Sequence, residues 1–347
     1  MIGIRFFVDL LAFFSIYLML STSLNLEFGY TGIPNFGKVL FFAGGAYVVG
    51  ATTSRLVAYI AGIHFKDFPS EHVAVATEAT KFLSGEPLLA TGIFIMMIIL
   101  GAIIGGILGY IASYPAIRLR EDYLGITLLA FGELVRIIAR NYDPLICGTL
   151  GVSVPNVFSY IPEPETRELM KIGIMVIIAL SVWIFVSRIT NSPFGRLLRA
   201  IRENEMAAKA LGKDIEAIRM KTLVVGSAIA GIAGALYAFY TGYVQADDFV
   251  PIKTFIVWVM VMIGGPGNNL GAIVGAFTYL FIEKFVMFVK SYIEAPFDIV
   301  YLAYIVLGAI LILILMFRPE GMLPEKPIRT VNIRREENEG DFKGYRC

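Results

Sequence analysis

The chain has 347 residues, of which 57% are hydrophobic and only 16% are charged, and its formal net charge is +1. Soluble proteins carry about 25% charged residues, so this composition excludes a disordered chain and disfavours a soluble enzyme. A nucleic-acid-binding protein would need a basic excess on one domain, and the balanced charges do not supply it.

The apolar residues collect in runs near the length of a bilayer-crossing helix, which is about 20 residues. Such runs are too long and continuous for barrel strands, so the sequence predicts an all-α, polytopic membrane protein with about eight to ten transmembrane helices. The stretch before residue 64 can hold two crossings or three, which leaves the side of the N-terminus open. The runs lie near residues 6–24, 39–61, 88–111, 123–138, 172–185, 222–243, 252–264, 270–289 and 299–317.

Basic loops give the orientation, because Lys and Arg accumulate on the cytoplasmic side of a membrane protein. We therefore expect loops 115–122 and 188–221 in the cytoplasm, and the acidic loops 64–87 and 141–170 outside. The predicted organisation is a transmembrane domain over 1–317, which includes loop 188–221, and a cytoplasmic tail over 318–347.

The cytoplasmic loop contains the signature of a short helix. Asn204 is a good N-cap, and Gly212 suits the left-handed residue that ends a helix. The small Ala207 and Ala208 between them would let a partner surface approach closely. The alternative interpretation is an ordinary solvated amphipathic loop.

This helix resembles the EAA-type coupling loop of ABC-importer permeases through Glu205, Ala207, Ala208 and Gly212, although Met206 separates the acid from the alanines. Other segments resemble branched-chain amino-acid permeases, and the LivM-type subunit in particular. These segments are Asn25-Leu26, Gly29-Tyr30-x-Gly32, Gly44-Gly45-Ala46-Tyr47, Leu119-Arg120-Glu121-Asp122-Tyr123, Leu129-Ala130-Phe131-Gly132-Glu133-Leu134-Val135-Arg136, Arg199-Ala200-Ile201-Arg202-Glu203-Asn204-Glu205 and Arg318-Pro319-Glu320-Gly321.

The resemblance implies a permease subunit of an ATP-driven importer for branched-chain amino acids, working by alternating access in the cytoplasmic membrane of a prokaryote. It also implies a homologous second permease subunit, two ATP-binding subunits and an extracellular solute-binding protein, all around a lipid bilayer. We expect no cofactor and no nucleic-acid partner, and no enzymatic activity because the sequence shows no nucleophile–base pair or metal cluster. The chain also has no phosphate-binding GK[ST] motif, so ATP would be bound by a separate subunit. The alternatives are a related permease for urea, amides, sugars or nucleosides, and an ion-coupled secondary transporter.

Two Gly- and Pro-rich breaks precede apolar helices in the two halves of the chain. Paired breaks of this kind mark discontinuous helices at the substrate route of transporters, so both segments are candidates for that route. Two ordinary turns are the alternative. The candidate residues are Gly32, Pro34 and Asn35 in the first break, and Gly265, Pro266, Asn268 and Asn269 in the second.

Charged residues inside the apolar runs need partners, because a lone charge at a helix centre costs about 2.5–3.5 kcal/mol on insertion scales. Glu133 and Arg136 lie three residues apart on one helix face, and we interpret them as a structural intramembrane ion pair. The alternatives are a position near the outer end of the helix beside Arg140, and a contact with substrate. We expect Lys38 to lie near a membrane interface with its amine in water. His64 and His72 lack acids at metal-ligand spacing and are expected to be solvated.

Overall fold

Helices make up most of the described chain. The structure is a computed structural model that describes residues 2–118, 121–290, 300–318 and 320–325. The α-helices are α1 (Ile2–Leu24), α2 (Lys38–Ala61), α3 (Phe68–Gly85), α4 (Pro87–Arg118), α5 (Glu121–Asn141), α6 (Asp143–Ile146), α7 (Pro164–Thr190), α8 (Pro193–Glu203), α9 (Glu205–Ala210), α10 (Ile215–Thr241), α11 (Ile252–Gly264), α12 (Asn269–Lys290) and α13 (Val300–Phe317).

Five short elements connect these helices. A π-helix, η1 (Asn25–Tyr30), continues α1, and two 3₁₀ turns follow as η2 (Gly148–Leu150) and η3 (Ala246–Asp248). The strands β1 (Val152–Ser153) and β2 (Tyr243–Val244) pair antiparallel, with Val152 opposite Val244. These elements tie the loop before α7 to the loop after α10.

The predicted class, an all-α polytopic membrane protein, is confirmed. Within the described residues, six helices are long and apolar enough to cross a membrane: Phe6–Tyr30, Lys38–Ala61, Pro87–Pro115, Pro164–Thr190, Ile215–Thr241 and Asn269–Phe288. The remaining predicted runs correspond to α5, which carries five charged residues, to α11, which has only 13 residues, and to α13. Two helices, α1 and α2, precede residue 64, which decides between the two counts left open by the sequence.

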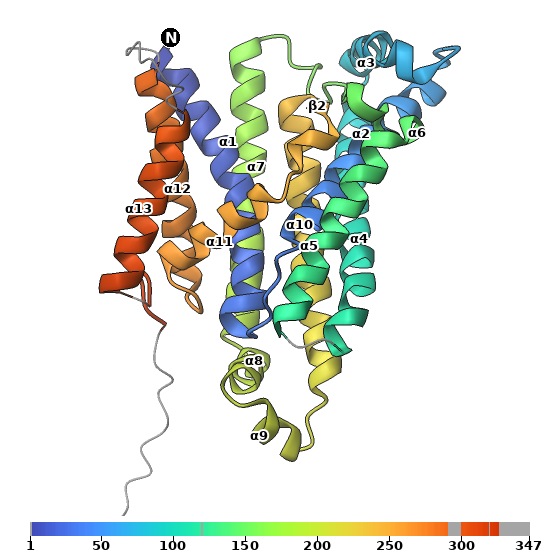
Figure 1. Cartoon of the computed structure of the whole chain (residues 1–347). Coiled ribbons are helices and arrows are strands. Elements are labelled where there is room, and N and C mark those ends of the chain that lie inside the picture. The colour runs from blue at the N-terminus through green and yellow to red at the C-terminus, as the bar shows by residue number, and fades with distance from the viewer. Residues whose placement is uncertain (1, 119–120, 291–299, 319, 326–347) are drawn as a thin grey trace, which may run out of the picture.

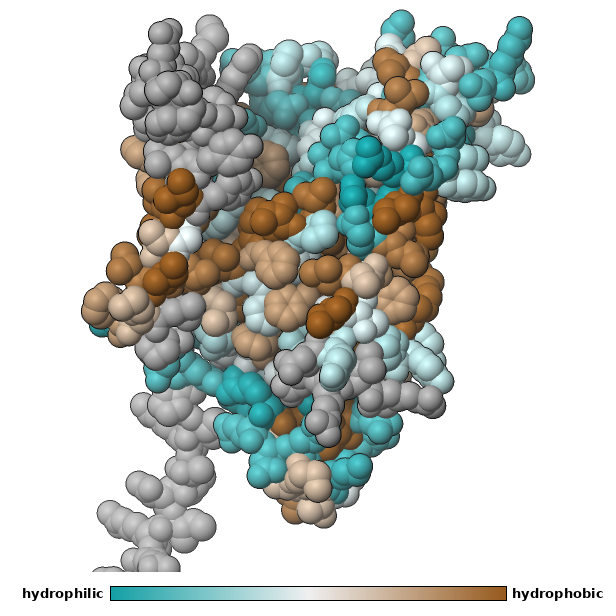
Figure 2. Space-filling view, viewed as in Figure 1, coloured by the Kyte–Doolittle hydropathy of each residue, from teal (hydrophilic) through white to brown (hydrophobic). Residues whose placement is uncertain are grey.

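The two ends of the bundle differ in what they carry. Helices α8 and α9 project from one end, while α3, α6 and β2 lie at the opposite end, beside the N-terminus (Figure 1). The predicted basic loop 188–221 and the predicted acidic loops 64–87 and 141–170 are therefore on opposite ends. Figure 2 shows hydrophobic residues across the middle of the visible face and hydrophilic residues at both ends, as expected for a membrane-embedded bundle.

Helix α10 packs against α2 and α4 through glycines. A Cβ added at Gly105 of α4 would lie 2.4 Å from the carbonyl oxygen of Ser227, and one added at Gly231 would lie 2.1 Å from that of Gly101. Only glycine allows this approach, and small residues four apart are the usual device for backbone contact between membrane helices. The packing fixes α2, and with it the entrance to the first break.

His72 corrects one expectation. His64 is exposed, but the side chain of His72 on α3 is only 8% exposed. Its Nδ1 accepts a hydrogen bond from the backbone N–H of Ser153 at 3.1 Å. The imidazole is thus a packing and hydrogen-bonding group that joins α3 to β1, rather than a solvated side chain.

Candidate functional site

The loop between α7 and α10 contains two helices, α8 and α9, and side chains cap the starts of both and the start of α10. Ser192 caps α8 by accepting from the N–H of Phe194, Asn204 caps α9 by accepting from that of Ala207, and Asp214 caps α10 by accepting from that of Ala217. Gly212, with φ of +73°, provides the left-handed residue after α9. Local capping chemistry in the sequence therefore fixes where this projection bends.

The projecting surface of α9 is apolar in part. Glu205 and Ala207 are exposed, as is Gly212 after the helix, whereas Ala208 is buried. Two large apolar side chains, Met206 and Leu211, are 76% and 79% exposed. Exposed apolar groups at the tip of a polar projection are typical of a protein–protein contact.

Glu205 has a partner that sequence reasoning missed. Its carboxylate accepts from Arg219 of α10, with Nη2 to Oε2 at 3.0 Å. This ion pair spans the turn between α9 and α10 and holds the short helix against the longer one. The sequence could have indicated this pair, because the acid Glu205 and the base Arg219 lie on either side of the turn predicted at Gly212.

The first break is a buried polar cluster. The amide Nδ2 of Asn35 donates to Oε2 of Glu27 at 2.8 Å, and Nζ of Lys38 donates to Oε1 of the same carboxylate at 2.8 Å. All three side chains are at most 1% exposed. The expectation that Lys38 lies at an interface is therefore wrong, because the Glu27 carboxylate within α1–η1 provides a buried counter-ion that the sequence analysis overlooked.

The remaining first-break residues shape the backbone around this cluster. Gly32 has φ of +77°, and an added Cβ would lie 3.2 Å from Cγ of Arg202 on α8. Pro34 accepts a backbone hydrogen bond from Phe36 at 3.2 Å. Nε1 of Trp258 donates to the carbonyl of Asn35 at 3.0 Å, which ties the break to α11.

The second break joins α11 to α12, and its amides are also engaged. Gly265 has φ of +108°, and Pro266 follows it in the turn. Oδ1 of Asn268 accepts from the N–H of Leu270 and caps α12, while Nδ2 of Asn269 donates to Thr190 at 2.7 Å. These contacts connect α12 to the end of α7.

Asn25 joins η1, which directly precedes the first break, to the second break. Its Nδ2 donates to the carbonyl of Asn268 at 3.1 Å, and its Oδ1 accepts from the N–H of Gly267 at 2.8 Å. The side chain is fully buried. The π-helix that follows α1 and the segment that precedes α12 are thus one connected unit, although they are more than 240 residues apart in the chain.

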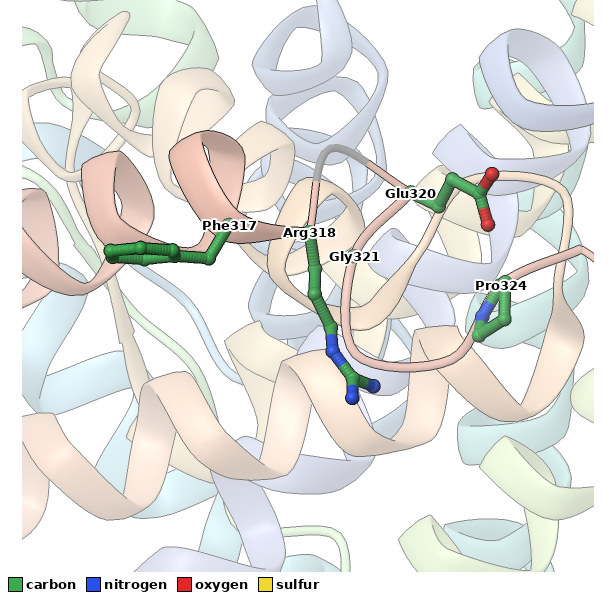
Figure 3. A pocket seen from close by; sticks show the side chains of 5 residues that line it. All are labelled: Phe317, Arg318, Glu320, Gly321 and Pro324. Carbon is green, nitrogen blue, oxygen red and sulfur yellow. The ribbon is translucent and has the colours of Figure 1, made fainter.

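Two hollows lie next to this unit. One, of 230 Å³, is lined by Tyr30, Trp183, Ser187, Asn191, Arg199 and residues 267–270. We call it the α7–α12 cavity. The other, of 300 Å³, is lined by Phe317, Arg318, Glu320, Gly321 and Pro324 at the end of α13 (Figure 3). In Figure 3 the side chains of Arg318 and Glu320 point away from one another.

The charged residues of α5 lie apart from both breaks. Nε of Arg136 donates to Oε2 of Glu133 at 3.0 Å, so the structure places the two residues as an ion pair. Arg136 also contacts Asp247 of η3 at 2.6 Å, and Arg140 lies 3.6 Å from the same carboxylate. The pair is therefore part of a four-residue network that joins α5 to η3.

Comparison with known proteins places these features in a family. Residues 6–315 match the model for the permease component of branched-chain amino acid transport systems. The probable LivM permease of Methanocaldococcus jannaschii is 40% identical over 332 residues, covering 94% of this chain and 96% of that protein. The LivM permease of Escherichia coli is 26% identical, covering 91% and 70%.

A second kind of permease also matches. The probable LivH permease of M. jannaschii is 25% identical over 308 residues, covering 87% of this chain and 85% of that protein. No solved structure matches the chain.

Proposed function

The chain belongs to the family of permease components of branched-chain amino acid transport systems, and on this premise we propose that it is a LivM-type subunit of an ATP-driven importer for these amino acids. It pairs with a homologous LivH-type permease, two ATP-binding subunits and an extracellular solute-binding protein. The assembly lies in the cytoplasmic membrane of a prokaryote. ATP is hydrolysed on the separate ATP-binding subunits.

The projection formed by α8 and α9 supports this proposal most directly. Helices α8 and α9 project from one end of the bundle (Figure 1). Met206 of α9 and Leu211 directly after it are exposed. The small Ala207 between them leaves room for a close partner surface. A short helix that is capped at its start, braced by the Glu205–Arg219 ion pair and exposed at its tip suits a coupling contact with an ATP-binding subunit.

The connected breaks support a substrate route through the cytoplasmic half of the bundle. Segments 31–37 and 265–268 connect separate helices, η1 to α2 and α11 to α12. Their backbone groups would serve the substrate as those of discontinuous helices do in other transporters. The α7–α12 cavity combines Arg199, amides and the apolar Leu270 and Trp183. An amino acid needs the same combination, because it carries a carboxylate, an ammonium group and an apolar side chain.

Co-purification of the intact importer tests the coupling contact. The complete set of subunits is expressed with a tag on this chain, and the amount of ATP-binding subunit retained is measured for wild type and Ala207→Arg. The variant should lose that subunit, whereas Ala74→Arg, at an exposed alanine on α3 at the opposite end, should retain it. Equal retention in both variants would contradict the assignment of α9 as the coupling helix.

A further inference from the structure

The tail after α13 folds back onto the second break. The N–H groups of Met322 and Leu323 donate to the carbonyls of Ile263 and Gly264 at 2.9 and 3.0 Å. Nδ2 of Asn268 donates to the carbonyl of Pro324 at 2.9 Å. Residues 321–325 are therefore held by the end of α11 and the start of α12 rather than trailing away from the bundle.

The same tail segment carries one carboxylate to α8. Oε1 of Glu325 lies 2.9 Å from Nε of Arg199, and Oε2 lies 2.5 Å from Nη2 of Arg202. The three side chains are between 13% and 26% exposed, so water screens these ion pairs less than it screens pairs on an open surface.

Arg202 makes a second contact on the other side. Its Nη1 donates to the backbone carbonyl of Gly29 in η1, and its stem packs against Gly32 of the first break. The planar guanidinium presents several donors in fixed directions, so one side chain can hold a carbonyl and a carboxylate together. Arg202 thus contacts both breaks, the first directly and the second through Glu325.

Arg202 lies two residues before Asn204, the cap of α9. A displacement of α9 acts on α8, whose last turn contains Arg202. It also acts on α10, but α10 is packed closely through glycines against α2 and α4. Helices are stiff, and the charge-assisted hydrogen bond from Arg202 to Glu325 is directional. This bond and the Arg199–Glu325 ion pair therefore link α9 to both breaks.

We propose that Arg202 and Glu325 are positioning residues for transport, and that they convert motion of α9 into movement of the first and second breaks. Through Glu325 the tail takes part in transport, because it connects α8 to the turn between α11 and α12. This inference rests on the proposed function, because it requires an ATP-binding subunit that displaces α9.

The test uses the complete importer in proteoliposomes, in which leucine uptake and ATP hydrolysis are measured together. Glu325→Gln keeps the size of the side chain but removes both ion pairs. It should lower the uptake per ATP hydrolysed by about tenfold, which lies within the usual range of coupling between sites, while ATP hydrolysis continues. Glu325→Asp, which keeps the charge, should recover part of that ratio.

The matched control is Glu320→Gln, at an exposed acid of the same tail, and it should leave the ratio unchanged. Should Glu325→Gln fail to assemble, Arg202→Lys gives the same comparison, because a single ammonium cannot hold Gly29 and Glu325 at once. An unchanged ratio in these variants, or equal losses of uptake and hydrolysis, would overturn the proposal. Wild-type vesicles that take up no leucine would instead contradict the proposed function, and the inference with it.

Discussion

Nζ of Lys38 and Oε1 of Glu27 form an ion pair at 2.8 Å in which neither side chain is more than 1% exposed. The pair lies where α1 gives way to η1 and where α2 begins. Asn35 completes the coordination of the carboxylate. An ion-coupled transporter would need a buried carboxylate that is free to take up a cation, and this one is neutralised by its own chain.

Lys38→Met should destabilise the protein strongly. Removing one partner of a buried pair leaves an uncompensated charge and costs about 3–5 kcal/mol, whereas replacing both partners with apolar groups is often neutral. The apparent melting temperature of the purified chain in detergent should therefore fall in Lys38→Met. Much of it should return in the double variant Lys38→Met with Glu27→Leu, and additive losses in the double variant would contradict this account of the cluster.

Two adjacent glycines of α4 should respond in opposite ways to alanine. At Gly105 the new Cβ would lie 2.4 Å from the Ser227 carbonyl, while at Gly106 its nearest neighbour would be 3.7 Å away. Overpacking of this kind costs about 1–3 kcal/mol, and alanine in an uncrowded helix position is favoured over glycine by about 1 kcal/mol. Gly105→Ala should lower the melting temperature and Gly106→Ala should not; similar shifts would refute close packing of α4 on α10.

How much the sequence could predict depends on whether the determinants were local. Asn204 and Gly212 act on neighbouring residues, so the boundaries of α9 followed from capping rules. The membrane class followed from the lengths of the apolar runs. The sequence also paired the two breaks through their shared Gly, Pro and Asn content, although it gave no reason for their contact.

Contacts between distant segments could not be predicted. Asn25 with Gly267, and Arg202 with Glu325, are separated by more than 100 residues, and no local pattern reports such pairings. Lys38 shows the consequence, because a lone lysine at the start of an apolar run is usually an interfacial residue. Its counter-ion, Glu27, lies between Asn25-Leu26 and Gly29-Tyr30. The sequence analysis compared these flanking residues with a permease family and did not consider the charge of Glu27.

Acid should weaken the contact between α3 and β1 through His72. Burial lowers the pKa of His72, so between this lowered value and the ordinary value of about 6.5 the unfolded chain binds more protons than the folded one. The contribution of neutral His72 to the free energy of unfolding is therefore fully present above about pH 6.5, and it is lost as the pH drops towards the pKa of the folded state. His72→Asn should flatten the decline in melting temperature below pH 6.5.

His64→Asn is the matched control for this experiment, since His64 is exposed and lies in the segment between α2 and α3. It should preserve the pH dependence of the wild type. A decline of equal steepness in His72→Asn and wild type would show that other groups govern the acid response.

Asn268 and Asn269 are neighbours whose replacement by alanine should produce different defects. Nδ2 of Asn268 holds the tail at Pro324, so its loss should lower the uptake per ATP hydrolysed, as loss of Glu325 does. Asn269 lines the α7–α12 cavity, and within the described residues its Oδ1 accepts no hydrogen bond. This oxygen is buried in the structure, so it would accept from the ammonium group of an amino acid once the α7–α12 cavity widens during transport.

Asn269→Ala should therefore raise the KM for uptake by about tenfold, since a hydrogen bond to a charged group contributes about 1.5–3 kcal/mol, and it should leave the uptake per ATP hydrolysed near wild type. Measuring both quantities for both variants in proteoliposomes separates the two roles. If Asn269→Ala leaves KM unchanged, the substrate does not pass this amide, and the α7–α12 cavity is a packing defect between α7 and α12. If the two variants change KM and uptake per ATP hydrolysed in the same way, Asn268 and Asn269 do not have the separate roles of tail attachment and substrate contact.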